Sequence, residues 1–317
     1  MAAKRSVLIA GAGYWGKRVI NEYLKLLDSN LLDNIYVFDT DPGNLHFNDN
    51  RIISGTEIGE YMGRVDFAHV CTPNVTHFPI AEKLLNSGIA TLIEKPLTEV
   101  AEEAAILHDM AERNSAVLRV GMVYRYSKAV ERAKEILMGS VGATEMIYAS
   151  WLHNVDIPNI RRVMTGRDVV WDVFIHLLDV LNYLYDVFPD FSYAKGISGA
   201  NGYNHTFSAL GRLVGSTVNM SSTFKSHRKQ RMIQIIGEKG NLELDLLNNR
   251  ISYGNDDDLR TENFYDNPLS SEIKAFIDSK TDSDKRNSGK IGFVEVKLIS
   301  HLLKMSKQDK IYRDEVQ

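Results

Sequence analysis

The spacing of apolar residues divides the chain into two parts. Up to residue 121, short apolar runs typical of buried strands occur at 6–10, 35–39, 65–71, 90–94 and 116–121. Amphipathic stretches with helical spacing lie between these runs, at 15–28, 76–87 and 98–113. This alternation predicts βαβ units and a doubly wound parallel sheet with helices on both faces.

The pattern changes beyond Gly121. A helical stretch, a strand-like run and a mostly apolar helix come first, at 127–138, 143–153 and 169–184. Runs separated by turn residues then predict consecutive strands at 191–198, 203–211, 214–223, 230–237, 241–247 and 250–253. Two helices close the chain, near 269–279 and 292–306. We therefore predict an α/β protein with the parallel sheet in residues 1–121 and an α+β domain with a large, mostly antiparallel sheet in residues 122–317.

Composition and charge fit this division and exclude some classes of protein. The chain has 317 residues, enough for two domains, with 44% hydrophobic and 25% charged residues. Its net charge of −4 gives no indication of a nucleic-acid or membrane partner. The single cysteine, Cys71, excludes an intramolecular disulfide and fits a reducing compartment. No apolar stretch has the length of a signal-peptide core or a transmembrane helix, so we expect a soluble cytoplasmic protein.

A glycine-rich turn, GAGYWG, follows the first predicted strand. Gly11 permits the tight turn, Gly13 lets a pyrophosphate approach the backbone, and Gly16 allows the helix to pack closely on the strand. The N-terminus of that helix then faces the phosphates of a dinucleotide. Since the motif follows a strand and opens a helix, it predicts a Rossmann site whose loop also contains Tyr14 and Trp15.

Asp39, at the end of the second predicted strand, supports this interpretation. A carboxylate there can accept hydrogen bonds from the adenosine ribose and would repel a 2′-phosphate. The alternative is that Asp39, with Asp41, only starts the following turn. We predict NAD as the cofactor, with NADP less favoured.

Polar residues also follow two later strands, at the sheet edge where ligands of doubly wound folds bind. Glu94 ends one strand and leads into Lys95 and Pro96, which bring a cation to the expected position of the nicotinamide and the substrate. The alternative for Lys95 is a charged loop residue before a helix cap at Thr98. The other strand leads into a turn that we expect to contact the cofactor, formed by Thr72, Pro73 and Asn74.

Three polar residues interrupt the apolar helix predicted at 169–184. Asp172, His176 and Asp179 follow one another at steps of four and three, which places them on one face of a helix. Taken alone, such groups most often form a satisfied buried network. After a dinucleotide-binding half, the stripe becomes a candidate substrate-facing wall. We select Asp172 and His176 as candidate catalytic residues and leave Asp179 as structural or supporting.

Six motifs together resemble those of a known family: GAGYWG, CTPNVTH, IEKPLT, VGMVYRYS, DVFIHLLD and GEKGNLELD. Their order and approximate spacing resemble the glucose–fructose oxidoreductase/inositol dehydrogenase family, often called Gfo/Idh/MocA, along nearly the whole chain. The resemblance implies a nicotinamide-binding Rossmann domain and an open-faced α/β domain whose sheet mediates homodimers or homotetramers. It also implies oxidation or reduction of secondary alcohols on sugars, cyclitols and nucleotide-sugars.

The resemblance assigns roles to particular residues. Lys95 belongs to the Glu-Lys-Pro motif near the reacting hydroxyl, and Asp172 and His176 correspond to the D-x-x-x-H pair at the substrate. Histidine suits the base that takes the hydroxyl proton, and lysine can stabilise alkoxide character on the same oxygen. Arg125, in VGMVYRYS, and Arg161 are further candidates for substrate binding. The reaction expected is direct hydride transfer without a metal.

The chain departs from the family pattern at Phe174, where many members have glycine or alanine. We expect this bulk to reshape the substrate pocket. The preceding stretch, NIRRVMTGRDVVWD, resembles the branch that acts on UDP-N-acetylglucosamine-type sugars. Its arginines Arg161, Arg162 and Arg167 suit phosphate or carboxylate groups, or else lie on a solvated surface, and both interpretations stay open.

Other interpretations account for only part of the pattern. A non-catalytic NAD(H)-binding redox sensor is expected to lack the lysine or the histidine, and both are present. A metal-dependent hydrolase built on the helix stripe leaves the glycine motif and Asp39 unexplained. The basic stretch FKSHRKQR (224–231) is interpreted as a hairpin end, and the acidic stretch YGNDDDLR as a solvated turn.

Overall fold

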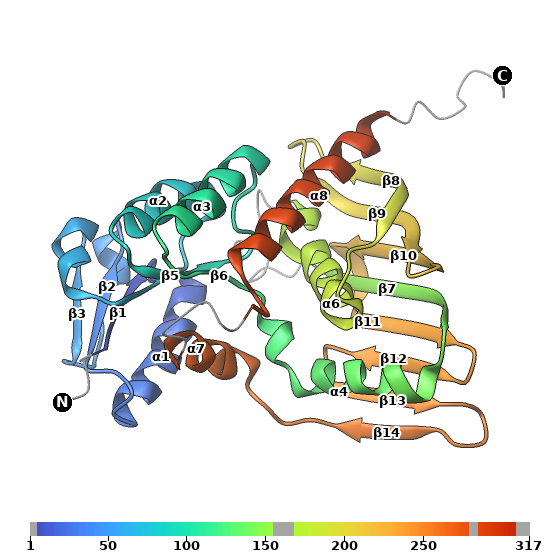
Figure 1. Cartoon of the computed structure of the whole chain (residues 1–317). Coiled ribbons are helices and arrows are strands. Elements are labelled where there is room, and N and C mark those ends of the chain that lie inside the picture. Colours follow the sequence, from blue (N-terminus) through green and yellow to red (C-terminus); the bar gives the residue numbers. More distant parts are fainter. Residues whose placement is uncertain (1–4, 155–167, 279–284, 309–317) are drawn as a thin grey trace. The chain divides into compact units, whose positions relative to one another are not determined.

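The computed structural model describes residues 5–154, 168–278 and 285–308. The chain forms two compact units (Figure 1). Unit 1 comprises Met1–Val123 and Asn267–Lys297, and unit 2 comprises Tyr124–Asp266 and Leu298–Gln317.

Unit 1 contains a six-stranded parallel sheet in the order β3-β2-β1-β4-β5-β6. The strands are β1 (Ser6–Ala10), β2 (Asn34–Phe38), β3 (Ile52–Gly55), β4 (Phe67–Val70), β5 (Ala90–Glu94) and β6 (Leu118–Gly121). This is the Rossmann strand order, with the topological switch point between β1 and β4. The predicted doubly wound parallel sheet is therefore confirmed.

Helices cover both faces of this sheet. The helices are α1 (Tyr14–Asp28) and α7 (Pro268–Asp278) on one face, and α2 (His77–Asn86) and α3 (Ala101–Arg113) on the other (Figure 1). Ile273, Phe276 and Ile277 of α7 join the core beneath α1, where the rings of Phe67 and Phe276 meet edge to face at 5.4 Å.

This packing differs from the predicted division, which assigned all of residues 122–317 to the second domain. The segment Asn267–Lys297 belongs to unit 1. Helical periodicity shows that α7 has an apolar face, but it cannot show which of two sheets that face covers.

Unit 2 contains an eight-stranded sheet in the order β14-β13-β12-β11-β7-β10-β9-β8. The strands are β7 (Thr144–Asn154), β8 (Asp190–Ser198), β9 (Asn204–Leu213), β10 (Ser216–Thr223), β11 (Lys225–Gly237), β12 (Asn241–Asp245), β13 (Arg250–Gly254) and β14 (Arg260–Asn263). Neighbouring strands are antiparallel except β7 and β10, which are parallel. The predicted mostly antiparallel sheet is confirmed.

The two faces of this sheet differ in their surroundings. Helices α4 (Lys128–Ile136) and α6 (Ile175–Tyr185) lie on one face (Figure 1). Along β9, Phe207 and Ala209 point to the covered face and are buried. The next residue, Leu210, points to the other face and is 47% exposed. Helix α8 (Gly289–Gln308) belongs to unit 1 up to Lys297 and to unit 2 beyond it.

Several local predictions differ from the structure. The strands β3 and β14 were not predicted, because each has four residues and neither shows a clear alternation of apolar and polar positions. The stretch 224–231 is not a hairpin end: from Lys225 onward it forms the first half of β11. The acidic stretch does form an exposed turn, in which Asn255 accepts hydrogen bonds from two backbone N–H groups. None of the described helices combines the length and apolar character needed to span a bilayer.

Candidate functional site

The glycine loop joins β1 to α1 in the conformation that a dinucleotide site requires. Gly11 has φ +98°, and a Cβ there would lie 2.8 Å from the carbonyl carbon of Cys71. A Cβ on Gly16 would overlap the carbonyl oxygen of Gly11. At Gly13, by contrast, a Cβ would meet nothing within 4 Å. The first and third glycines therefore allow close packing, and the second faces open space where a phosphate can approach.

Helix α1 begins at Tyr14 without a side-chain cap and without an acidic residue in its first turn. Its first N–H groups are thus suited to an anion. Of the two aromatic residues of the loop, Tyr14 is 65% exposed and its hydroxyl accepts a hydrogen bond from Arg18, whereas Trp15 packs partly against the core of unit 1. These observations fit a pyrophosphate held by loop backbone and helix N-terminus.

Asp39, directly after β2, is linked to the glycine loop. Its Oδ2 atom accepts a hydrogen bond of 2.7 Å from the backbone N–H of Ala12, and a weaker one from Asn44. Its Oδ1 atom accepts from the backbone N–H of Asp41. Asp39 therefore starts the turn, as the simpler interpretation held, and also fixes the glycine loop. A carboxylate has about four lone-pair positions, so these contacts leave room for a ribose hydroxyl.

The loops after β4 and β5 are joined by a residue that sequence reasoning placed only in a helix. His77, the first residue of α2, is fully buried. Its Nδ1 atom lies 2.9 Å from the carbonyl oxygen of Pro96, and its Nε2 atom lies 3.0 Å from that of Thr72. The imidazole thus links the turn Thr72–Pro73–Asn74 to the Glu-Lys-Pro segment. The side chain of Asn74, in turn, donates to Glu99 at 2.6 Å.

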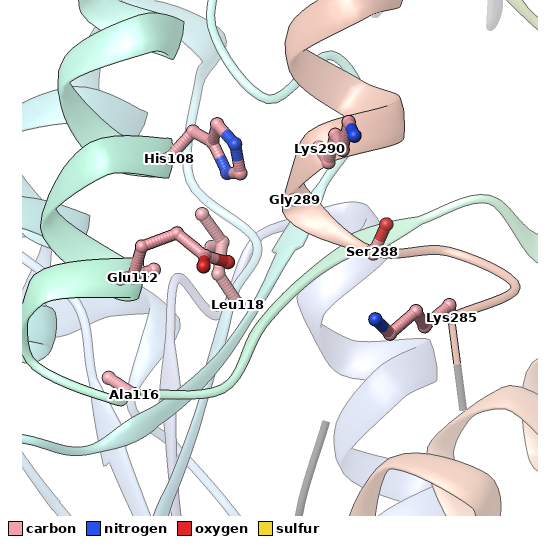
Figure 2. Close-up of a pocket in the computed structure, with 9 residues that line it drawn as sticks. His108, Glu112, Ala116, Leu118, Lys285, Ser288, Gly289 and Lys290 are labelled. Carbon is pink, nitrogen blue, oxygen red and sulfur yellow. The ribbon is translucent and has the colours of Figure 1, made fainter. Parts of the chain in front are cut away.

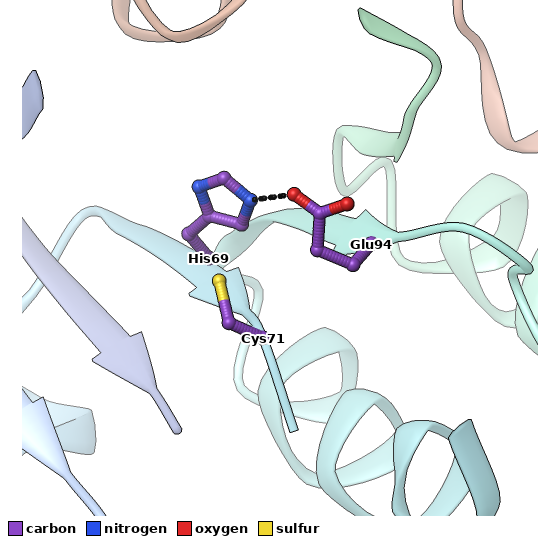
Figure 3. Close-up of side chains that lie close together, drawn as sticks. All are labelled: His69, Cys71 and Glu94. Atoms are coloured by element: carbon purple, nitrogen blue, oxygen red, sulfur yellow. Dashed lines mark hydrogen bonds and ion pairs between the residues drawn. The ribbon is translucent and has the colours of Figure 1, made fainter. Parts of the chain in front are cut away.

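Glu94 and Lys95 lie at the carboxyl end of β5. Both side chains are partly buried. The Glu94 carboxylate faces His69 of β4, with Oε1 3.2 Å from Nε2 (Figure 3). The other ring nitrogen of His69 lies 3.3 Å from the hydroxyl of Tyr23. Burial raises the pKa of Tyr23, so the phenol donates to His69, and His69 can donate to Glu94.

Cys71 completes a cluster with His69 and Glu94, in which one ligand atom of each lies within 4.8 Å of the others (Figure 3). Both nitrogens of His69 already have hydrogen-bond partners. Burial also raises the pKa of the Cys71 thiol well above its usual value, which opposes the thiolate that a metal needs. These contacts favour a partly buried polar network at this edge of the sheet over a metal centre.

In unit 2, Asp172 and His176 are partly exposed, whereas the other residues of the helical segment from 169 to 182 are buried. Asp172 lies in a π-helical turn, Val170–Phe174, which continues into α6. The ring of His176 stacks on Trp151 of β7 at 5.2 Å between centroids and meets Tyr124 edge to face at 5.4 Å. The stripe predicted from spacing therefore presents these two residues and fixes the imidazole between aromatic rings.

Asp179 and Arg125 have a different role. Their side chains are 1% and 3% exposed and form an ion pair within unit 2. Arg125 also donates to the side chain of Asn182 at 2.7 Å. The predicted supporting role of Asp179 agrees with this arrangement. Arg125, predicted to bind the substrate, is a buried cation paired within unit 2, and its substrate role stays a prediction.

Phe174, expected to reshape the substrate pocket, lies in the core of unit 2. It is fully buried and packs edge to face on Phe207 of β9, with 5.1 Å between ring centroids. Its bulk fills the core under the sheet, and its effect on the substrate pocket stays a prediction. Arg161, Arg162 and Arg167 lie outside the described residues.

A small pocket in unit 1 lies away from the cofactor edge (Figure 2). His108 and Glu112 of α3 face Lys285, Ser288 and Lys290 across it. Ala116 and Leu118 line it at the amino end of β6, opposite to the edge where ligands of parallel sheets bind.

Comparisons with known proteins agree with this description. Residues 5–122 match the model of a family described as an oxidoreductase family with an NAD-binding Rossmann fold. A UDP-N-acetylglucosamine 3-dehydrogenase from Acidithiobacillus ferrooxidans is 28% identical over 191 residues, 60% of this chain and 58% of that protein. An inositol 2-dehydrogenase from Rubrobacter xylanophilus is 27% identical over 200 residues, 59% of this chain and 55% of that protein. The chain thus spans under two thirds of the length of these relatives.

Solved structures share the fold over almost the whole chain. A structure of the Acidithiobacillus ferrooxidans enzyme has a TM-score of 0.82 at 22% identity, covering 95% of this chain and 97% of that one. Levoglucosan dehydrogenase in complex with NADH and levoglucosan also has a TM-score of 0.82, at 16% identity, with 96% and 97% covered. The family model over residues 5–122 and these relatives agree with the resemblance drawn from the motifs: the first part of the chain matches an oxidoreductase family with an NAD-binding Rossmann fold, and the named relatives are dehydrogenases of the glucose–fructose oxidoreductase/inositol dehydrogenase (Gfo/Idh/MocA) type.

Proposed function

We propose that the protein is an NAD-dependent dehydrogenase or reductase that acts on a secondary alcohol or ketone of a sugar, cyclitol or nucleotide-sugar. The observation that carries the proposal is the open space beside Gly13 in the glycine loop. This space adjoins the uncapped N-terminus of α1, and Asp39 holds the loop through the N–H of Ala12. The partly exposed pair Asp172 and His176 in unit 2 supplies the second part of the argument.

The residues of each unit have distinct tasks in this proposal. The turn from Gly11 to Gly16 holds the pyrophosphate, and Thr72, Pro73 and Asn74 contact the nicotinamide half. When bound, the nicotinamide ring would supply the hydride chemistry, as acceptor for oxidation of the alcohol carbon or as donor for reduction of the ketone. His176 takes the hydroxyl proton, because imidazole has a pKa near working pH. Lys95 donates a hydrogen bond to the same oxygen, and Asp172 orients the substrate.

The preference for NAD rests on Asp39. A carboxylate beside the adenosine ribose accepts hydrogen bonds from the 2′- and 3′-hydroxyls and repels a 2′-phosphate. Because the Asp39 side chain is partly exposed, its remaining lone pairs can reach a ribose.

The substrate class follows the relatives. Two relatives matched over 191 and 200 residues are named for UDP-N-acetylglucosamine and inositol, and a further relative from Bacillus subtilis is named glucose-6-phosphate 3-dehydrogenase at 31% identity over 127 residues. A nucleotide-sugar of the UDP-N-acetylglucosamine type is the finer proposal. Its support is the similarity of the stretch before Asp172 to that branch.

The test is NADH formation from NAD with a panel of inositols, aldoses, sugar phosphates and UDP-sugars. His176→Ala and Lys95→Ala are expected to lose about 100-fold or more in kcat/KM, the usual contribution of a positioned proton-transfer group. His301→Ala and Lys304→Ala, at exposed positions of α8, are the matched controls and should retain activity. Tight NADH binding without turnover of any substrate would instead favour a redox sensor.

We also propose that the protein forms a homodimer or homotetramer through the sheet of unit 2. The face of this sheet that α4 and α6 leave uncovered carries large apolar side chains, among them Tyr148 at 42%, Leu210 at 47% and Tyr193 at 39% exposure. A monomer in light scattering at micromolar concentration would contradict this part of the proposal.

A further inference from the structure

Arg231 lies on the helix-covered face of the unit 2 sheet, beside the candidate substrate residues. In the antiparallel pair of β11 and β7 it stands directly opposite Trp151. Opposite residues of an antiparallel pair share one face of the sheet. Trp151 is the ring on which His176 stacks, so Arg231 and His176 contact the same indole.

The surroundings of Arg231 fix its side chain but leave its charge uncompensated. The guanidinium carbon lies 4.4 Å from the centroid of Trp151, and Nη1 donates a 2.9 Å hydrogen bond to the hydroxyl of Tyr124. Burial raises the pKa of Tyr124, so this acceptor is a neutral phenol. Over the described ranges, no carboxylate lies within ion-pair distance of Arg231, although the side chain is partly buried.

Other groups extend the positive charge at this position. His153 lies two residues beyond Trp151, hence on the same face of β7. Burial lowers its pKa, and the charges of Lys229 and Arg231 lower it further, while Asp172 acts in the opposite direction. His153 is therefore close enough for the charges of both cations and of the Asp172 carboxylate to shift its pKa. Among the described residues whose charges act on His153, Lys229 and Arg231 are cations and Asp172 is the anion.

A guanidinium held on an aromatic ring, with donors left over, is suited to bind a phosphate or carboxylate. We propose that Arg231, assisted by Lys229, binds an anionic group of the substrate while Asp172 and His176 engage the hydroxyl that reacts. This inference rests on the proposed function for the identity of the reacting group. It narrows the substrate class to sugars that carry a phosphoryl group or a carboxylate.

The test compares charged and neutral sugars in the wild-type protein, Arg231→Gln and Arg113→Gln. Arg113, the last residue of α3 in unit 1, is exposed and belongs to neither candidate site nor the proposed oligomer face, so its substitution removes the same charge without touching the site. Kinetics are measured with glucose, glucose 6-phosphate, glucuronate, N-acetylglucosamine and UDP-N-acetylglucosamine. Calorimetric titration with UDP and with inorganic phosphate gives a second measurement that needs no turnover.

We expect the wild-type protein to prefer one charged sugar over its neutral counterpart. Which charged sugar is preferred distinguishes a phosphate, a diphosphate and a carboxylate. Arg231→Gln should raise KM for that sugar about 10- to 100-fold, with less than a threefold change in kcat, and Arg113→Gln should leave both unchanged. Arg231→Lys should recover part of the loss, because lysine keeps the charge but not the planar fork.

Three results would overturn the inference. The first is equal use of charged and neutral sugars. The second is an Arg231→Gln variant that lowers kcat alone, since this would make Arg231 a positioning residue for His176 through Trp151. The third is unchanged UDP and phosphate binding in that variant. Failure of every sugar to reduce NAD, with anion binding still lost in Arg231→Gln, would refute the proposed function and leave the anion site supported.

Discussion

The imidazole of His77 spans two backbone carbonyls, at 2.9 Å from Pro96 and 3.0 Å from Thr72. A neutral imidazole can donate only one of these hydrogen bonds. Burial lowers the pKa of His77, although both carbonyls favour the charged form, so the neutral ring is favoured in the folded protein. His77 thereby ties together the two loops that we assign to the cofactor.

Replacing His77 should loosen both loops. We expect His77→Phe to lower the free energy of unfolding by about 1–3 kcal/mol, because a buried carbonyl loses its donor. It should also raise KM for NAD. His77→Gln retains donors and should be milder in both respects. Urea denaturation and steady-state kinetics measure the two effects; a Phe variant with wild-type stability and wild-type KM would contradict the role assigned to His77.

The same residue predicts a pH dependence of stability. Its folded pKa lies below the ordinary value of 6.5, so the unfolded chain binds more protons between the two values. The contribution of His77 to the free energy of unfolding is therefore fully present above the unfolded pKa. It decreases as the pH falls from 6.5 toward the folded pKa. The stability difference between wild type and His77→Gln should shrink over this range; a difference that grows would refute the assignment.

The buried pair Arg125–Asp179 predicts a stability effect without a specific substrate effect. Arg125→Met leaves a buried carboxylate without its cation and should cost about 3–5 kcal/mol, whereas the double variant Arg125→Met/Asp179→Leu should recover much of this loss. The exposed pair Arg260–Asp258 is the control, where Arg260→Gln should cost under about 1 kcal/mol. If Arg125→Met is stable but raises the substrate KM, the substrate-binding role expected from sequence is correct.

A substitution at Asp39 can separate the effect of the carboxylate charge from the effect of its hydrogen bond to the glycine loop. Asp39→Asn keeps an acceptor for the N–H of Ala12 but removes the charge that repels a 2′-phosphate. We expect the ratio of kcat/KM for NAD to that for NADP to fall about tenfold or more, with stability within about 1 kcal/mol of wild type. An unchanged ratio would remove Asp39 from the cofactor assignment.

Periodicity predicted where the polar residues of the 169–184 helix lie, but not what they contact. Asp172, His176 and Asp179 have equivalent spacing, yet Asp179 is buried because Arg125, 54 residues earlier, reaches it. Such a partner is fixed by tertiary packing and leaves no local signal. The surroundings of Phe174 could not be predicted for the same reason, since its partner Phe207 lies on β9, more than 30 residues further along the chain.

The cofactor half was more predictable, because its features are local. The glycine loop follows directly from the spacing of three glycines between a strand and a helix. His77 was missed as a link between loops because its two acceptors are backbone carbonyls, which any sequence supplies. The position of His77, between the CTPN turn and the start of a helix, was the one sequence feature that pointed to this linking role.

The most direct test of the account follows hydrogen from the substrate to the cofactor. The best sugar of the panel is supplied with deuterium on its carbons, and the reduced cofactor is analysed by mass spectrometry. We predict one deuterium in the reduced nicotinamide of the wild-type reaction, and a rate at least about 100-fold lower in His176→Ala with NAD binding retained. Reduced cofactor without deuterium, or an equal rate in His176→Ala, would contradict the account.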